Sequence, residues 1–276
     1  MKLKYYGTAA AEGVPSLYCS CDVCKYSKKA GGRNVRTRSQ AMVDDRLLID
    51  IGPDTLYHCH IYGLELGQVE HLLITHRHAD HLDTPTLNFR SKGFVVEDLP
   101  ELNIYGSLPT INTISDALLN SRVKERGNWV LHEISPFTET IVKDYKVVAY
   151  KANHDPTTNP YIYEISDGQK RMLYGHDSGS LPEETWAYLE KEKPYFNLVS
   201  LDCTMGIASS NGHHHMNVDD CVNTKKKLIE IGCADENTIF ILHHFSHNGK
   251  VSYDELVPIA EKEGFLVSYD TMEIEF

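Results

Sequence analysis

The chain has 276 residues, of which 41% are hydrophobic and 24% charged, and its formal net charge is −12 at pH 7. This composition is typical of a globular protein with a substantial core and excludes a disordered chain. The acidic balance argues against a protein that grips long nucleic acids, and the lack of a signal-peptide-like start or a long apolar run predicts a cytoplasmic protein that crosses no membrane.

The first predicted strand, residues 2–7, leads through a loop to three cysteines within six residues, Cys19, Cys21 and Cys24. The C-x-C-x-x-C spacing supplies three thiolates to one tetrahedral ion, and a closed structural zinc site needs a fourth ligand from elsewhere. Unliganded or redox-active cysteines are the alternative. Because the chain has seven cysteines and the other four are scattered, a disulfide framework is not expected. We therefore predict a zinc-binding loop at about residues 15–30.

A hairpin of residues 41–43 and 47–50 is followed by an apolar strand, 71–75, which runs directly into His76-Arg77-His78-Ala79-Asp80-His81. Strand geometry lets His76 and His78 face one ion, while Asp80 and His81 reach a second after the chain turns. Imidazole and carboxylate ligands suit zinc, manganese or iron, and two neighbouring ions can hold a hydroxide between them. The pattern predicts hydrolysis, against a histidine-rich surface turn as the alternative.

Strands alternate with helices through the rest of the chain, which predicts a layered α/β architecture in a single domain, residues 1–276. A helix or loop is expected from Asp83 onward and a helix from Asn217 to about Gly232. The other expected elements are strands 102–105, 146–152, 198–201 and 238–242, a hairpin of 161–165 and 171–174, a helix at 110–126, and a strand pair or extended edge at 265–274.

Several further candidates follow the predicted strands. His154 and Asp177 come after strand ends, where an isolated histidine is usually a surface or core residue and an aspartate is usually a turn or cap. Three consecutive histidines, His213 to His215, precede the predicted helix at Asn217. At a helix N-terminus one of them can touch a phosphate or protonate a leaving group, although a solvated loop is the alternative.

The His-x-His-x-Asp-His motif and these later residues resemble the metallo-β-lactamase superfamily. The resemblance implies the four-layer αββα sandwich of that superfamily. It also implies that one catalytic ion takes His76, His78 and His154, that the other takes Asp80, His81 and His244, and that Asp177 bridges them. Asp50 matches the strand-end aspartate that supports the metal ligands, although a plain turn aspartate is an equal alternative.

Two features narrow the resemblance: the cysteine cluster and His-x-x-His at His244 and His247. Together with the ending at 268–274, they are similar to the phosphoribosyl cyclic phosphate phosphodiesterases of carbon–phosphorus lyase pathways. That likeness implies that His247 completes a structural zinc site with the three cysteines, and that His215 assists the leaving oxygen. The expected reaction is attack of a metal-bridging hydroxide on a small, anionic, cyclic phosphodiester, with Asp80 and His215 as catalytic residues. A homodimer is one expected assembly.

Five other functions compete with this interpretation. A ribonuclease Z-like nuclease would share the metal ligands, but the acidic balance and the cysteine cluster argue against it. A pyrroloquinoline quinone biosynthesis-like protein would also carry N-terminal cysteines. Flavodiiron proteins have Glu in place of His78, and glyoxalase-type thioester hydrolases have glycines where this chain reads Leu82-Asp83. A non-catalytic metal-binding scaffold is the remaining alternative.

Overall fold

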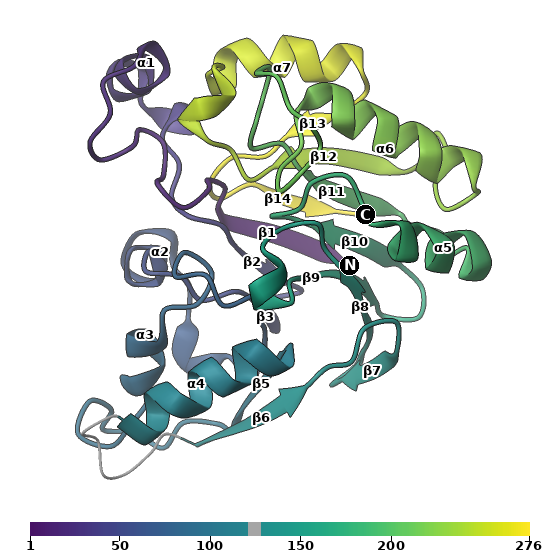
Figure 1. The fold of residues 1–276 in the computed structure, drawn as a ribbon. Helices are drawn as coiled ribbons and strands as arrows, with labels where there is room; N and C mark the ends of the chain where they lie inside the picture. Colours follow the sequence, from purple (N-terminus) through teal and green to yellow (C-terminus); the bar gives the residue numbers. More distant parts are fainter. Residues whose placement is uncertain (121–127) are drawn as a thin grey trace.

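The computed structural model describes residues 1–120 and 128–276, which form two seven-stranded β-sheets packed face to face (Figure 1). In spatial order, the first sheet contains β14 (Glu273–Glu275), β1 (Lys2–Gly7), β2 (Gln40–Val43), β3 (Leu47–Ile49), β4 (His71–Leu73), β5 (Leu102–Gly106) and β6 (Trp129–Glu133). The second contains β13 (Leu266–Val267), β12 (Ile239–His243), β11 (Leu198–Asp202), β10 (Arg171–Gly175), β9 (Tyr161–Ser166), β8 (Tyr145–Lys151) and β7 (Glu139–Val142).

Apolar side chains from alternate positions of the strands fill the space between the two sheets. Tyr5 and Ile49 reach this core from the first sheet, and Tyr163, Met172 and Ile241 reach it from the second. Neighbouring positions on the same strands point to the outer faces, because successive side chains of a strand alternate. Each sheet therefore needs a second apolar layer on its other side.

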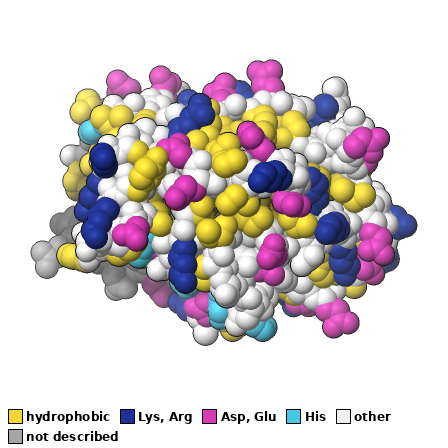
Figure 2. Space-filling view, turned by 90° about the horizontal axis from the view of Figure 1, so that it is seen from above, with side chains coloured by type: hydrophobic (Ala, Val, Ile, Leu, Met, Phe, Trp, Pro, Cys, Tyr) yellow, Lys and Arg dark blue, Asp and Glu magenta, His cyan; other side chains and the backbone are white. Residues whose placement is uncertain are grey.

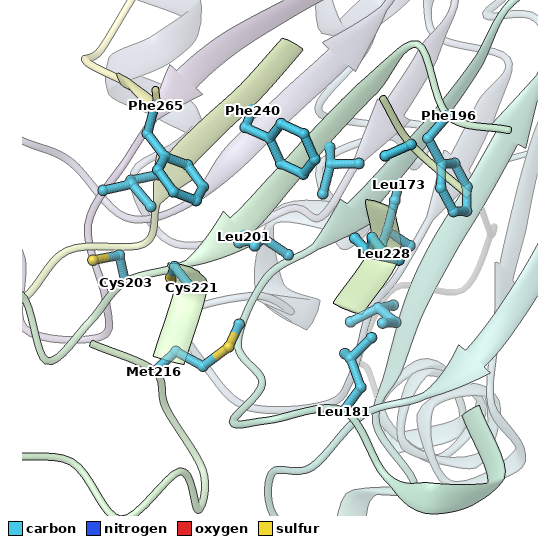
Figure 3. Packing of buried hydrophobic residues seen from close by; sticks show 14 of the residues in the cluster. Leu173, Leu181, Phe196, Leu201, Cys203, Met216, Cys221, Leu228, Phe240 and Phe265 are labelled. Carbon is cyan, nitrogen blue, oxygen red and sulfur yellow. The ribbon is translucent and has the colours of Figure 1, made fainter. Parts of the chain in front are cut away.

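Helices supply these outer layers. The helices α2 (Thr55–Tyr62), α3 (Thr84–Asn88) and α4 (Leu108–Asn120) lie on the side of the first sheet, where Leu48, Leu72 and Ile114 belong to one cluster. The helices α5 (Glu183–Glu192), α6 (Val218–Glu230) and α7 (Tyr253–Lys262) cover the second. Figure 3 shows part of that packing, with Leu228 and Phe240 among the labelled side chains. The predicted αββα sandwich is confirmed.

The structure corrects several sequence predictions. The expected zinc-binding loop contains a helix, α1 (Asp22–Ala30), and strand 71–75 ends at Leu73. The C-terminal strands do not pair with each other: β13 pairs with β12, and β14 pairs with β1 in the other sheet. The predicted helix at 110–126 begins earlier, at Leu108, and its part beyond residue 120 lies outside the described residues.

The strands that matter for the site all end at one edge of the sandwich. β10, β11 and β12 are parallel to one another, and β3 and β4 are parallel in the other sheet. The carboxyl ends of parallel strands meet at one edge, so the loops that follow these strands lie close together.

The surface above the α6–α7 layer carries acidic and basic side chains interspersed around an apolar centre (Figure 2). Within residues 1–120 and 128–276, no helix is both long and apolar enough to cross a membrane.

Candidate metal centre

The first predicted metal-ligand set converges as expected. His76 and His78 follow β4, His154 follows β8 and Asp177 follows β10, and one ligand atom from each lies within 4.8 Å of the others. His76 Nε2 is 2.9 Å from His78 Nδ1 and 3.2 Å from Asp177 Oδ2. His154 Nε2 is 3.1 Å from His78 Nδ1.

The second predicted set lies beside the first and shares Asp177 with it. Asp80, His81 and His244 each place a ligand atom within 4.8 Å of one another and of Asp177. Asp177 Oδ2 is 3.1 Å from His81 Nε2 and 3.9 Å from His244 Nε2. One buried carboxylate thus stands between two groups of nitrogen and oxygen ligands, which is the placement predicted for a bridging residue.

Several donor atoms of the two sets are placed to bind a cation rather than to form hydrogen bonds with one another. His81 Nε2, His244 Nε2 and Asp177 Oδ1 are buried and have no hydrogen-bond partner among the described residues. Buried polar atoms in native proteins nearly always have a partner, so these three atoms are suited to contact a bound ion. Five imidazoles and two carboxylates supply the nitrogen and oxygen ligands that zinc, manganese and iron take.

Side chains behind the ligands fix their orientation. Asp50 Oδ2 is 2.7 Å from His81 Nδ1, and its Oδ1 accepts a hydrogen bond from the Thr75 backbone N–H. Asp50 is fully buried, which argues against the alternative of a plain turn aspartate and favours a role in supporting the metal ligands. A carboxylate on the second nitrogen of a ligating histidine holds the ring and raises its basicity.

Two supporting carboxylates were missed by the sequence analysis. Asp202 Oδ2 is 3.2 Å from His244 Nδ1, and Asp155 Oδ2 is 3.2 Å from His78 Nε2. Asp202 ends the buried strand β11, so the strand-end position that singled out Asp50 could have identified it. Asp155 directly follows His154 in the chain, but its carboxylate contacts His78, and no sequence pattern indicates this contact.

Of the three consecutive histidines, only His215 reaches the metal centre. Its Nδ1 is 3.1 Å from Asp202 Oδ2 and 3.3 Å from Asp177 Oδ1. His213 and His214 are exposed, and His214 contributes its backbone oxygen, 3.3 Å from His154 Nδ1. His215 lies in the loop before α6 rather than in the helix.

Burial and neighbouring carboxylates have opposite effects on the pKa values of His215 and His154. Burial alone would lower the pKa of His215, but Asp202, then Asp177 and Asp80, raise it to about 9. Burial dominates at His154 and lowers its pKa to about 4, as suits a neutral ligand. The pKa values of these two neighbouring histidines are thus shifted in opposite directions.

Three site residues have an unusual backbone. Asp50, Asp177 and His244 have positive φ values of 64°, 52° and 61°. Non-glycine residues seldom adopt this left-handed conformation, and those that do cluster at functional sites. At each position the chain turns sharply out of a strand and aims the side chain into the site.

The predicted structural zinc ligands also come together. Cys19, Cys21, Cys24 and His247 place their sulfur and nitrogen atoms within 4.8 Å of one another, and Cys21 Sγ is 3.5 Å from His247 Nδ1. Burial raises the pKa of Cys21, but the backbone of Cys24 and the ring of His247 lower it to about 7. Three thiols and one imidazole form the donor set of a closed structural zinc site.

A cavity of about 230 Å³ opens onto the metal centre. Five predicted ligands line it together with His215, and the loop that follows β1 closes one side with Ala10, Ala11 and Glu12. Its size suits a small organic molecule rather than a polymer threaded through the site.

A family model described as the beta-lactamase superfamily domain matches residues 45–245 of the chain. That range includes all seven predicted ligands of the paired site and excludes the cysteine cluster and His247. The curated ribonuclease Z of Pyrococcus horikoshii is 26% identical over 164 residues, which cover 58% of this chain and 53% of that protein. The chain thus spans about half the length of the curated relatives it matches.

Solved structures with the same fold match the whole chain. A diphosphatase from the PhnP family has a TM-score of 0.72 and 19% identity, and the match covers 100% of this chain and 97% of that one. Zinc-bound PqqB from Methylobacterium extorquens has a TM-score of 0.74 and 18% identity, with 100% of both chains covered. At this identity the likeness establishes the fold.

Proposed function

Since the chain belongs to the beta-lactamase superfamily, we propose that it is a metal-dependent hydrolase that cleaves a small phosphodiester, with a cyclic one as the preferred form. The superfamily predicted from the sequence is confirmed. The substrate, the reaction and the number of ions are our proposal.

The observation that carries the proposal is the position of Asp177 between two ligand sets. His76, His78 and His154 would hold one divalent ion, Asp80, His81 and His244 would hold the other, and Asp177 would contact both. Such a pair of ions supplies Lewis acidity at the phosphoryl oxygens and lowers the pKa of a bound water. The protein's own contribution is to place the donors around a common centre.

Protonation of the leaving oxygen is the step that involves His215. Hydrolysis of a phosphodiester leaves an alkoxide oxygen that needs a proton, and a positioned acid within hydrogen-bond reach supplies it. His215 lines the cavity beside the metal centre, and Asp202 and Asp177 favour its protonated form. We propose that His215 donates this proton and that Asp202 holds its ring in position.

The test is hydrolysis of bis(p-nitrophenyl) phosphate by metal-free protein that is reloaded separately with manganese, zinc or iron. We expect turnover to return with metal and to fall by at least a hundredfold in Asp80→Ala, because that variant loses a ligand. Asp144→Ala removes an exposed carboxylate that pairs with Arg46 on the surface and is the matched control. Metal binding without turnover of any phosphodiester would favour the cofactor-biosynthesis or scaffold readings.

A second candidate, ribonuclease Z-like processing of tRNA, is supported by the identity to the Pyrococcus horikoshii enzyme. The net charge of −12 opposes it, because tRNA binding depends on basic surface. Cleavage of a precursor tRNA at a rate comparable to that of the small diester would favour this candidate.

A further inference from the structure

Among the described residues that line the cavity, Glu12 is the one charged side chain that is neither a predicted metal ligand nor His215. The described lining contains no Lys or Arg. The uncharged remainder includes Thr204, Met205, Ser246 and Asn248. The cavity therefore has an end that attracts anions, at the metal centre, and a wall that carries a carboxylate.

The Glu12 carboxylate is held in this position by its neighbours. Ser246 Oγ donates a hydrogen bond to Glu12 Oε1, and His247 Nε2 is 3.6 Å from the same oxygen. The backbone is anchored as well, since Ala10 N–H donates to the Phe245 carbonyl at 2.9 Å. The side chain keeps only 30% of its surface exposed, so it is a fixed part of the wall.

A nearby guanidinium is already engaged elsewhere. Arg38 Nε donates to the Ala11 carbonyl at 2.8 Å, but its Nη1 is 2.9 Å from Asp54 Oδ1. The charge of Arg38 is thus compensated by Asp54. Among the described residues, the ring of His247 at 3.6 Å is the ion-pair contact of Glu12, and it lies outside the cavity lining.

We propose that Glu12 makes the site select phosphodiesters whose organic group carries hydroxyls and no second phosphate. The inference rests on the proposed phosphodiesterase function and narrows its substrate class. It departs from the phosphoribosyl cyclic phosphates that the sequence resemblance implies, because those carry a second phosphate. A hydroxyl can donate a hydrogen bond to the carboxylate, whereas a second phosphate would meet a fixed negative charge without a cationic partner in the described lining. Juxtaposed like charges exclude wrong partners from binding sites.

The test compares two chromogenic esters that differ only in the second phosphate. One is thymidine 5′-(p-nitrophenyl phosphate), with a free 3′-hydroxyl, and the other is the same ester with a 3′-phosphate. We expect the metal-loaded protein to prefer the hydroxyl ester by at least tenfold in kcat/KM. Glu12→Gln, which keeps the shape and removes the charge, should reduce this preference at least fivefold, and Glu230→Gln on the surface of α6 should leave it unchanged.

Equilibrium binding gives a readout that does not depend on turnover. Calorimetry with the products, thymidine 5′-phosphate and thymidine 3′,5′-bisphosphate, should show the same order of affinity and the same change in Glu12→Gln. The metal content of the variant is measured alongside, because Glu12 contacts His247. If Glu12→Gln does not fold, the salt dependence of the wild-type preference replaces it, since added salt should weaken a charge-based preference.

The inference is overturned if the wild-type preference is below tenfold, or if Glu12→Gln leaves the preference unchanged. If that variant does not fold, a preference that is insensitive to salt overturns it. In each case the proposed phosphodiesterase activity stands. Loss of all turnover, including that of bis(p-nitrophenyl) phosphate, instead removes the proposed function itself. The two failures are thus distinguishable.

Discussion

His215 shows how one side chain acquires a role from its surroundings. The sequence places it in a run of three histidines, and only the fold separates it from the other two by bringing Asp202 and Asp177 to its ring. The supporting contacts come from the last residue of β11 and from the loop that follows β10. No local pattern around His215 contains them.

His215→Ala should lower kcat by about 10² to 10⁴, the range typical of a lost general acid, while metal content is unchanged. His213→Ala is the matched control, because His213 is exposed and lies outside the cavity lining. Initial rates with a saturating diester whose leaving group is an alkoxide, together with metal analysis of both variants, check the prediction. Equal rates for the two variants would remove the proton-donor role.

The sequence alone singled out the compact motif from His76 to His81 as a metal site. His154, Asp177 and His244 each follow a strand, a position that is not diagnostic by itself, and the family resemblance assigned them to the paired site. Asp155, Thr75 and Glu12 were not predictable in their roles, because their contacts join segments that are distant in the sequence or depend on a side-chain direction. The left-handed backbone at Asp177 and His244 is equally invisible, since neither residue is glycine.

At the scale of elements, the strands that carry the site were visible as apolar runs, and several helices were not. α7 contains Pro258, which interrupts helical spacing, yet Ser252 and Glu255 form a capping box that signals its start. α2 is apolar on both sides, so its sequence lacks a distinct buried face. The C-terminal strands could not be assigned to different sheets, because that depends on the path of residues 268–272 between the layers.

The segment after β4 depends on close contact with the segment after β3. Ile51 N–H donates to the His81 carbonyl at 2.8 Å, and a Cβ on Gly52 would lie 2.1 Å from the Asp80 backbone oxygen. The two segments approach this closely only because residue 52 has no side chain. The position of Asp80 thus depends on an element outside the motif.

Gly52→Ala should therefore displace Asp80 and lower kcat/KM by about 100-fold, as misplacement by about 1 Å can. Gly67→Ala is the matched control, because its added Cβ would meet only Leu99 Cδ2, at 3.8 Å. Titration of metal-free protein with manganese should show weaker binding in the first variant alone. Unchanged metal affinity and turnover in Gly52→Ala would contradict the close-packing argument.

At the scale of the whole molecule, a buried polar network ties the C-terminal segment to the start of the chain. Asp270 Oδ1 accepts from Thr8 Oγ1 at 2.6 Å, and its Oδ2 accepts from the Thr37 backbone N–H at 2.7 Å. Burial raises the pKa of Asp270 from 3.8 to about 6, against the lowering effect of these hydrogen bonds. The folded protein therefore holds this proton at a pH where the unfolded chain has released it.

Because the folded state binds more protons between pH 4 and 6, the contribution of Asp270 to the free energy of unfolding falls as pH rises through this window. The loss amounts to about 3 kcal/mol above pH 6. Asp270→Asn should remove this contribution, so the difference in stability between variant and wild type should change across the window. Urea unfolding at several pH values measures it, with the exposed Asp144→Asn as control.

The cysteine cluster joins distant parts of the chain, since Cys19, Cys21 and Cys24 surround the start of α1 while His247 follows the His244 segment. A metal at this cluster would hold the N-terminal segment against the wall of the paired site. Metal that binds only the folded protein stabilises it by mass action. This link makes the cluster a test of the whole assembly.

Cys24→Ser should bind one zinc ion fewer per chain and lower Tm by about 5 °C or more, because serine is a poor zinc ligand and the bound ion stabilises the fold. Cys59→Ser is the matched control: Cys59 is partly buried in α2 and belongs to none of the metal-capable groups of the described residues. Metal analysis and thermal unfolding of both variants check the prediction. We also expect a lower kcat in Cys24→Ser, because His244 and His247 share one short segment. Equal zinc content in the two variants would contradict a structural zinc site at the thiols. Packing alone would then account for the position of the His244 segment.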